Sequence, residues 1–229
     1  MTYIVFLGPP GVGKGTAGKE IESALGIGHF SSGDWFRYAE KNDSSELGKR
    51  MKEAMVLCKT GVLVPDDLTF QYIQFILRNV AAEKYRSGAL FDGFPRTQPQ
   101  AEAFDDFLTK QGTSITNVFY LTAPSDVLER RITNRRICPR CDHSYSLIEP
   151  TMKPKTDGVC DRDGAKLEQR NDDTQAVFHS RLAVYDKLTH PLVAYYKKQG
   201  KLIEIDGSKN PGEVHDAIKA ELQKIVRAA

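Results

Sequence analysis

The chain has 229 residues, of which 40% are hydrophobic and 27% are charged, and its formal net charge at pH 7 is +2. This length and composition fit one α/β enzyme domain with insertions, which can bury its core without disulfide bonds. The small net charge disfavours a protein that binds the backbone of a nucleic acid polymer, so we expect no nucleic acid partner.

The sequence also lacks the common signals for membranes and export. No stretch approaches the roughly 20 apolar residues of a membrane span, and the N-terminal residues do not form the pattern of a cleaved signal peptide. We therefore predict a cytoplasmic protein with no membrane partner.

The first element in the chain is an apolar run over residues 2–7, which leads into a glycine-rich segment and then a helical pattern. Glycines let the backbone curl around an anion with its N–H groups converging, while Lys14 adds a positive charge for the outer phosphates of a nucleotide. The strict motif has Ser or Thr directly after the lysine, whereas here Gly15 precedes Thr16, the hydroxyl expected nearest to magnesium. The predicted phosphate-binding residues are Gly11, Val12, Gly13, Lys14, Gly15 and Thr16.

Further strand-like runs follow at residues 29–31, 89–91, 117–121 and 202–205, and helical patterns separate them. Strands that alternate with helices pair in parallel through right-handed crossovers, which leaves the sheet covered on both faces. Near the end of the chain, Asn210 with Pro211 and Glu213 predicts the start of the last helix. The sequence therefore predicts an α/β fold with a P-loop NTPase-type core.

Two segments interrupt this alternation. Between Ser32 and Val64, a helical excursion separates two strands by more than one crossover helix needs. From about residue 134 to 173, the pattern changes to cysteine, proline, glycine and charge, with only short apolar pieces. We predict that both segments are insertions in the core.

The second insertion carries a pattern typical of a metal site. Cys138 and Cys141 are separated by two residues, the same spacing separates Cys160 from Asp163, and 18 residues lie between the pairs. Two such turns can bring four ligands together tetrahedrally, and three thiolates with one carboxylate suit zinc. Because protein fills all four positions, we expect a structural metal that folds a segment too small to fold alone.

The ligand set has alternatives at this level. His143 or Asp161 could replace Asp163 as the fourth ligand, and the sequence does not identify the metal present in the cell. Cys58, far away in the chain, is predicted to have no role. Cysteines gathered in a metal site fit a reducing compartment better than a disulfide framework does.

The remaining motifs closely resemble those of adenylate kinases. The acceptor-nucleotide segments of that family are similar to residues 31–37, 61–66 and 91–100 of this chain, the last of which reads Phe-Asp-Gly-Phe-Pro-Arg-Thr-Gln-Pro-Gln. The phosphate loop, the arginines between 131 and 136, residues 170–173 and Arg181 complete the resemblance, which covers essentially the whole chain. The cysteine segment resembles the zinc-binding lid of the long bacterial form.

This resemblance implies the reversible reaction of ATP, bound with Mg²⁺, and AMP to give two ADP. It also implies a monomer with a five-stranded parallel sheet flanked by helices, a structural Zn²⁺ and a hinged lid. The implied division places the core in residues 1–30, 65–133 and 174–229, an AMP-binding insertion in 31–64 and the zinc-binding lid in 134–173.

The resemblance also assigns roles in the reaction, which are described here by residue matching. Lys14 is expected to hold the β and γ phosphates, and Arg96 with Arg37 the phosphate of AMP. Asp92 is expected to orient the water shell of magnesium, which needs few protein ligands. The arginines expected to close over the transferring group are Arg131, Arg135, Arg170 and Arg181, with Asp172 pairing with them. Planar guanidinium groups suit phosphates well.

The base contacts complete the expected site. Gln100 is expected to read the adenine edge of AMP. The AMP-binding set is Ser32, Arg37, Val62, Leu63, Val64, Gly93, Phe94, Pro95, Arg96, Gln100, Arg170 and Arg181. Besides the phosphate loop, the ATP-binding set contains Arg135, Ser144, Tyr145 and Lys209.

Three other functions remain open at this stage. A UMP/CMP kinase shares the phosphate loop and the acceptor segment, but typically has a short lid without cysteines. A GTP-using AMP kinase is harder to separate, because contacts to the donor base are largely made by the backbone. A zinc-stabilised nucleotide switch or RNA-binding module would not need the second phosphate site around residues 93–100.

Overall fold

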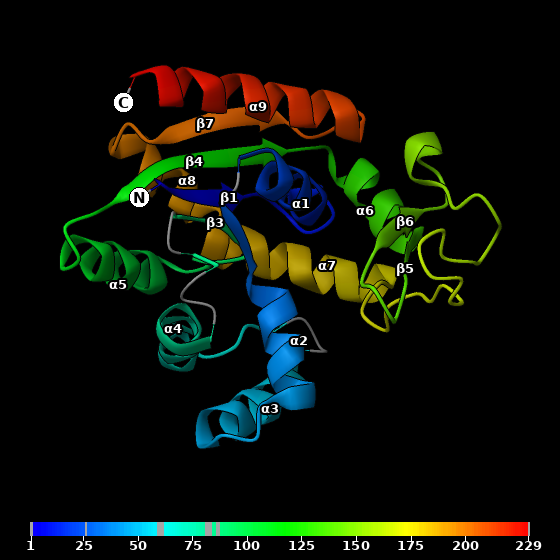
Figure 1. Ribbon diagram of the computed structural model, residues 1–229, viewed down its shortest axis with the longest axis horizontal. Helices are drawn as coiled ribbons and strands as arrows, with labels where there is room; N and C mark the ends of the chain where they lie inside the picture. Colours follow the sequence, from blue (N-terminus) through cyan, green and yellow to red (C-terminus); the bar gives the residue numbers. More distant parts are fainter. Residues whose placement is uncertain (1, 26, 59–61, 81–83, 86–87, 229) are drawn as a thin grey trace.

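The computed structural model describes residues 2–25, 27–58, 62–80, 84–85 and 88–228, and only the backbone of residues 23–25, 57–58, 79–80 and 225–228 (Figure 1). Gly61 of the acceptor motif and the side chain of Cys58 therefore lie outside the described residues.

The core is a parallel sheet with the strand order β2-β3-β1-β4-β7. Its strands are β1 (Thr2–Leu7), β2 (Gly28–Ser31), β3 (Gly88–Asp92), β4 (Ile115–Thr122) and β7 (Leu202–Asp206). All neighbouring strands pair in parallel. This confirms the five strands and the parallel sheet predicted from the sequence, with ends that differ by up to two residues.

Both faces of the sheet are buried, which explains why β1 is apolar at successive positions. Tyr3, Val5 and Leu7 pack in one hydrophobic cluster, while Ile4 and Phe6 pack in another. Side chains of a strand alternate between faces, so a strand covered on both sides needs apolar residues at every position.

Helices cover the two faces. The cluster around Ile4 includes side chains from α1 (Lys14–Leu25), α6 (Ser125–Thr133), α7 (Gln175–Val184) and α9 (Pro211–Ala228). The cluster around Val5 includes side chains from α4 (Asp66–Phe75), the π-helix η1 (Ile76–Val80), α5 (Gln98–Thr109) and α8 (Pro191–Lys198). A second π-helix, η3 (Tyr185–Thr189), joins α7 to α8. Figure 1 shows α9 lying along β7 and β4.

The first insertion forms α2 (Ser32–Asn42) and α3 (Glu46–Cys58), which project from the sheet in Figure 1. Ala39 of α2 and Met51 of α3 are buried within the cluster that covers the core sheet, so the pair is packed against the core at its base. Trp35 stacks on Phe30 of β2, and its indole N–H donates to the hydroxyl of Tyr85 at 3.0 Å. These contacts hold the first turns of α2 against the core.

The second insertion has its own small core. β5 (Arg135–Ile137) pairs antiparallel with β6 (Ser144–Ser146), and a 3₁₀-helix, η2 (Pro150–Met152), follows. Cys138, Tyr145, Cys160 and Leu167 form a separate buried cluster. This segment touches α1, since the ammonium of Lys19 donates to the main-chain oxygen of Asp142 at 3.1 Å. Strands of three residues carry no usable periodicity, which is why the sequence did not predict this hairpin.

The last helix begins as predicted. The Asn210 side chain accepts from the main-chain N–H of Glu213 at 3.0 Å, and the Glu213 carboxylate accepts from the main-chain N–H of Asn210 at 3.3 Å. This reciprocal pair satisfies donors that a helix N-terminus leaves without partners. None of the described helices is long and apolar enough to cross a lipid bilayer.

We predict that Asn210→Ala lowers the free energy of unfolding by about 1 kcal/mol, because the first turn of α9 loses its cap. Asn210→Ser keeps a capping oxygen and serves as the control, with a change of only a few tenths of a kcal/mol. Urea unfolding of both variants measures the difference, and equal stability of the two would show that the cap contributes nothing.

Candidate active site

The phosphate loop connects β1 to α1 at the carboxyl edge of the sheet. Gly8 has φ +148°, and a Cβ there would lie 2.5 Å from the main-chain oxygen of Leu121, so a side chain does not fit. The ammonium of Lys14 curls back over the loop and donates to the main-chain oxygens of Gly8 at 2.7 Å and Pro9 at 2.9 Å. The loop and the start of α1 form the anion-binding end of a helix.

The surroundings of Lys14 destabilise its positively charged form. The pKa of Lys14 is lowered to about 8, chiefly by burial; Asp92 opposes this shift, and the positive charges of Arg96, Arg181 and Arg135 add to it. A cation destabilised in this way is stabilised again when a phosphate binds beside it.

Asp92 ends β3, directly beside Phe6 of β1 in the sheet register. Its carboxylate lies 3.7 Å from Nε2 of His29, whose side chain is buried. Burial alone would raise the pKa of Asp92, but His29 and the charges of Lys14 and Arg96 outweigh it and hold the pKa below its usual value. Asp92 is therefore ionised, as a residue that binds magnesium or its water shell must be.

The acceptor segment after β3 is organised around the main-chain oxygen of Gly93. This oxygen accepts from the hydroxyl of Ser32 at 2.8 Å and from Nε of Arg96 at 2.8 Å. Gly93 has φ +76°, and a Cβ would lie 2.6 Å from the Ser32 hydroxyl oxygen, so glycine is required. The following peptide bond, Phe94-Pro95, is cis. Because Ser32 and Arg96 share the main-chain oxygen of Gly93 as acceptor, Ser32 helps to position Arg96 through that backbone.

The predicted adenine-reading residue, Gln100, is buried and already bonded on both sides of its amide. Its Oε1 accepts from the main-chain N–H of Arg96 at 2.8 Å, and its Nε2 donates to Asp66 at 2.7 Å. The main-chain oxygen of Arg96 accepts from the hydroxyl of Thr189 at 2.8 Å. Residues from α4, α5 and η3 therefore fix the segment that carries Arg96.

A group of arginines stands opposite the phosphate loop, held by two adjacent acids. Arg135 donates through Nε and Nη2 to the two carboxylate oxygens of Asp173, which is fully buried. Arg181 donates to Asp172 at 3.1 Å, which confirms that Asp172 pairs with one of these arginines. Bidentate pairing fixes the plane of a guanidinium group.

Arg170 and Arg37 complete this group. Nε of Arg170 is buried and, among the described residues, has no hydrogen-bond partner. Burial, together with the charges of Arg37 and Arg135, lowers the pKa of Arg170 to about 10. Arg37 donates to Asp34, one turn earlier on α2. The carboxylates of Asp34, Asp172 and Asp173 therefore leave part of the positive charge of these arginines uncompensated.

A cavity of about 540 Å³ lies between the phosphate loop, α2, the acceptor segment and the lid. From the predicted sets, the residues that line it are Lys14, Arg37, Val62, Leu63, Val64, Gly93, Pro95, Arg96, Gln100, Arg170 and Arg181. Asp172 also lines it, and Ile137, Pro139 and Asp142 of the lid form part of its wall. The structure thus brings most of the residues predicted to bind AMP around one cavity, although Ser32 and Phe94 are not part of its lining.

Other predicted residues lie outside the lining of this cavity. Phe94 is fully buried in the hydrophobic core. Arg131 donates to the main-chain oxygens of Gly207, Ser208 and Lys209, the last at 2.8 Å. The structure therefore does not bring Arg131 to the arginines opposite the phosphate loop, because the loop after β7 takes up its guanidinium group.

The two lid residues predicted to contact ATP lie on β6. The hydroxyl of Tyr145 lies 3.4 Å from Sγ of Cys160 and accepts from the main-chain N–H of Asp161 at 2.8 Å. The Tyr145 ring is buried in the small core of the lid. Ser144 is half-buried at the start of the same strand. The Tyr145 side chain is therefore engaged inside the lid.

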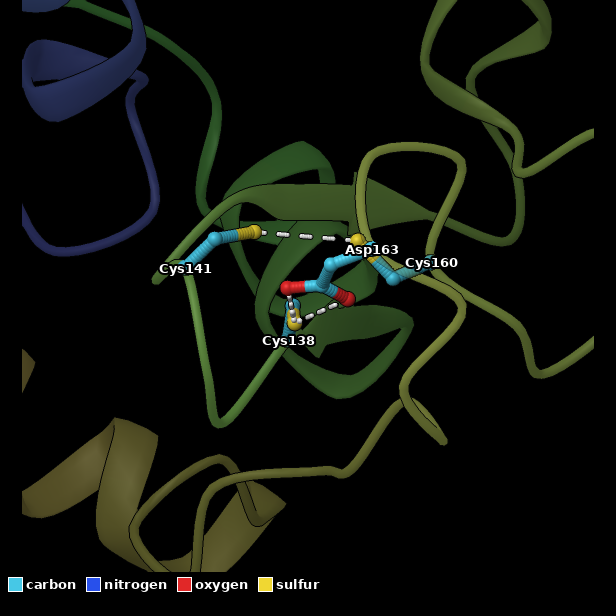
Figure 2. Close-up of side chains that lie close together, drawn as sticks. All are labelled: Cys138, Cys141, Cys160 and Asp163. Atoms are coloured by element: carbon cyan, nitrogen blue, oxygen red, sulfur yellow. Dashed lines mark hydrogen bonds between the residues drawn. The ribbon is translucent and has the colours of Figure 1, made fainter.

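The predicted metal ligands come together in the lid. One ligand atom each from Cys138, Cys141, Cys160 and Asp163 lies within 4.8 Å of all the others (Figure 2). Sγ of Cys141 and Sγ of Cys160 are 3.7 Å apart, and thiolates around one tetrahedral zinc, with Zn–S near 2.3 Å, are about 3.8 Å apart. The donors and their spacing fit zinc.

The two halves of this cluster have the same backbone turn. The main-chain N–H of Asp142 donates to the main-chain oxygen of Cys138 at 3.0 Å, and that of Gly164 donates to the main-chain oxygen of Cys160 at 2.9 Å. Hydrogen bonds, the largest effect coming from the main-chain N–H of Ala165, lower the pKa of Asp163 to about 2, so its carboxylate is ionised.

The alternative fourth ligands are engaged elsewhere. The His143 ring packs edge-on against Tyr145, and Asp161 accepts from the main-chain N–H of Lys155 at 2.9 Å. The described geometry therefore selects Asp163 over both.

Four residues that the sequence did not single out take part in this arrangement: His29, Asp66, Asp173 and Thr189. Each contacts a predicted residue that is far away in the chain, as Asp66 and Gln100 show. The local signals were that Asp66 ends the motif 61–66 and that Asp173 belongs to the pair of adjacent acids in the motif 170–173.

The parallel sheet, the phosphate loop and the half-buried cations around the cavity define this chain as a P-loop kinase. The family model described as Adenylate kinase matches residues 6–201. Proteins named adenylate kinase from Thermotoga neapolitana, Thermosipho melanesiensis and Caldanaerobacter subterraneus subsp. tengcongensis are 41%, 43% and 44% identical to it. These similarities cover 99%, 98% and 96% of this chain and 97%, 99% and 95% of the respective relatives. The chain belongs to the adenylate kinase family.

We predict that nucleotide affinity falls as pH rises through the pKa of Lys14, which is about 8 in the free protein. A bound phosphate raises this pKa, so the full affinity is present below pH 8 and is lost above it. Calorimetric titration with ATP should show about tenfold weaker binding at pH 9 than at pH 7, with proton uptake. In Lys14→Met this loss should disappear, whereas an equal pH dependence in both proteins would assign it to another group.

Proposed function

We propose that the chain catalyses the reversible transfer of a phosphoryl group from ATP, bound with Mg²⁺, to AMP, which gives two ADP. The observation that supports this most strongly is the set of half-buried cations around one cavity, where loss of solvation and mutual repulsion lower the pKa values of Lys14 and Arg170. Such a site is stabilised by polyanions, and phosphoryl transfer depends mainly on positioning and cationic stabilisation.

In the proposed reaction, an oxygen of the AMP phosphate forms a bond to the γ-phosphorus of ATP as the bond to the bridging oxygen breaks. The electron pair of the broken bond remains on the departing ADP. We assign Lys14 to the β and γ phosphates, and Arg96 with Arg37 to the phosphate of AMP. Arg135, Arg170 and Arg181 stabilise the charge that spreads over the transferring group. Magnesium would neutralise charge on the donor phosphates.

Asp92 and Thr16 are the residues proposed to hold that magnesium ion, through water or directly. The ionised state of Asp92 and its place beside the phosphate loop support this role. Asp172 and Asp173 are proposed to orient Arg181 and Arg135 respectively, since each acid is bonded to its arginine.

The acceptor base is proposed to lie against Gln100 and residues 62–64, which line the same cavity as Arg96. Ser32 supports this site through Gly93. At the donor end, we assign Ser144, the main chain of Tyr145 and Lys209 to ATP. Arg131 is proposed to hold the loop 207–209 in place for the donor base, because three main-chain oxygens of that loop accept from it.

We further propose that residues 31–64 and 134–173 act as separate units on the core, with the lid closing over bound ATP. Cys138, Cys141, Cys160 and Asp163 would hold a structural Zn²⁺, whose contribution is to fold the lid. We also propose that the enzyme acts as a monomer in the cytoplasm, where thiolates stay reduced.

A product assay tests the proposed reaction. The protein is incubated with ATP, Mg²⁺ and AMP, CMP, UMP or GMP in turn, and then with GTP in place of ATP. ADP formed selectively with AMP supports the proposal. Turnover with UMP or CMP would favour a pyrimidine kinase, and faster turnover with GTP than with ATP would reassign the donor.

Arg96→Ala should lower turnover by orders of magnitude, because the acceptor phosphate loses its cation, while the melting temperature changes little. Arg130→Ala is the matched control, since Arg130 is exposed on α6 and should leave turnover unchanged. Steady-state kinetics and thermal unfolding of both variants measure this. Near-normal activity of Arg96→Ala would remove Arg96 from the mechanism.

Cys138→Ser and Asp163→Ala should lose stoichiometric zinc and lower the melting temperature of the lid, with a smaller effect on turnover at low temperature. Asp161→Asn and His143→Ala should keep the metal, because neither residue belongs to the cluster. Elemental analysis measures the bound zinc and calorimetric unfolding measures the melting temperature, each with and without chelator. An unfolding profile that does not respond to chelator would refute a structural metal.

A further inference from the structure

Asp66 connects two parts of the acceptor site without belonging to the phosphate chemistry. It begins α4, directly after the segment 62–65, and its carboxylate reaches across to α5. One oxygen accepts from Nε2 of Gln100 at 2.7 Å, and the other accepts from the hydroxyl of Thr97 at 2.9 Å. The two oxygens of this carboxylate are therefore bonded to α5, one to Gln100 and the other to the N-cap residue Thr97.

These contacts fix which way the Gln100 amide points. A carboxylate only accepts hydrogen bonds, so the group that faces Asp66 must be the Nε2 amide. A main-chain N–H only donates, so the group that faces Arg96 N, at 2.8 Å, must be Oε1. A rotation of the amide by half a turn would place donor against donor and acceptor against acceptor.

The fixed amide still has one N–H and one oxygen lone pair to offer to the cavity that it lines. A 6-aminopurine presents a ring-nitrogen acceptor beside an amino donor, which matches this pair in one direction. A 6-oxopurine presents the reverse order, a ring N–H beside an oxygen. When Arg96 holds the phosphate and so fixes the base, the 6-oxopurine meets mismatched groups, and a site with unpaired buried polar groups rejects its ligand.

We propose that Asp66 is a specificity-determining positioning residue, which makes the acceptor site select AMP over 6-oxopurine monophosphates by fixing the orientation of the Gln100 amide. This inference rests on the proposed role of Gln100 at the base of AMP. The contact of Asp66 with Gln100 carries a full negative charge, and charge-assisted hydrogen bonds are stronger than neutral ones. Thr97 holds the carboxylate in place for this contact.

The test compares AMP with inosine monophosphate, its 6-oxo counterpart, as acceptors with ATP as donor. Asp66→Ser removes the contact with Gln100 but keeps a residue suited to a helix start. Asp66→Asn keeps an acceptor for Gln100, because its amide can turn its oxygen that way while the Thr97 hydroxyl accepts instead. Asp67→Ser is the matched control, since Asp67 is exposed and pairs with Arg50 on the surface.

We expect Asp66→Ser to raise KM for AMP about tenfold with kcat within about twofold, and to lower the AMP-to-IMP ratio of kcat/KM by about tenfold. Asp66→Asn should restore most of this ratio, and Asp67→Ser should leave it unchanged. Thermal unfolding of each variant is measured alongside. If Asp66→Ser does not fold, Asp66→Thr, which is also too short to reach Gln100, takes its place.

An unchanged AMP-to-IMP ratio in a folded Asp66→Ser protein would overturn the inference, even if its stability had fallen, because that pattern indicates a purely structural residue. Gln100→Ala separates this failure from failure of the proposed function. If it too leaves the ratio unchanged, Gln100 does not read the base and both assignments are wrong. If it abolishes the preference while Asp66→Ser does not, only the role of Asp66 is refuted.

Discussion

Mutual repulsion among half-buried cations is the constraint on which the rest of this structure depends. Lys14, Arg96 and Arg181 stand close enough that the charges of the arginines lower the pKa of the lysine. Like charges in such a site persist only where fixed carboxylates and rigid backbone hold them. Asp172 and Asp173 supply part of that compensation, yet the pKa of Arg170 stays at about 10. The remaining positive charge is what an adenylate kinase has available for two bound nucleotides.

Features that depend on neighbouring residues could be predicted from the sequence. The sheet followed from apolar runs, because strands buried on both faces leave a continuous pattern such as that of β1. The phosphate loop and the metal cluster followed from spacing, since a turn of fixed length brings Cys138 to Cys141 wherever it occurs. The capped start of α9 is equally local.

Features that depend on packing between distant segments could not be predicted in this way. Asp173 and His29 act on Arg135 and Asp92, which lie far from them in the chain, and only the folded sheet brings each pair together. Tyr145 lies inside the lid core instead of facing the nucleotide with its ring. Its ring fills the small cluster formed with Cys138, Cys160 and Leu167, and nothing beside Tyr145 in the sequence indicates this packing.

Trp35 has a practical consequence that follows from its position. It is the only tryptophan in the chain, and it joins α2 to the core by stacking on Phe30 and donating to Tyr85. Indole fluorescence changes with ring stacking and with hydrogen bonding of its N–H. The emission of the unlabelled enzyme therefore arises at the junction of α2 with the core, and the lid contributes no tryptophan signal of its own. A spectrometer can follow that junction in real time without any dye attached.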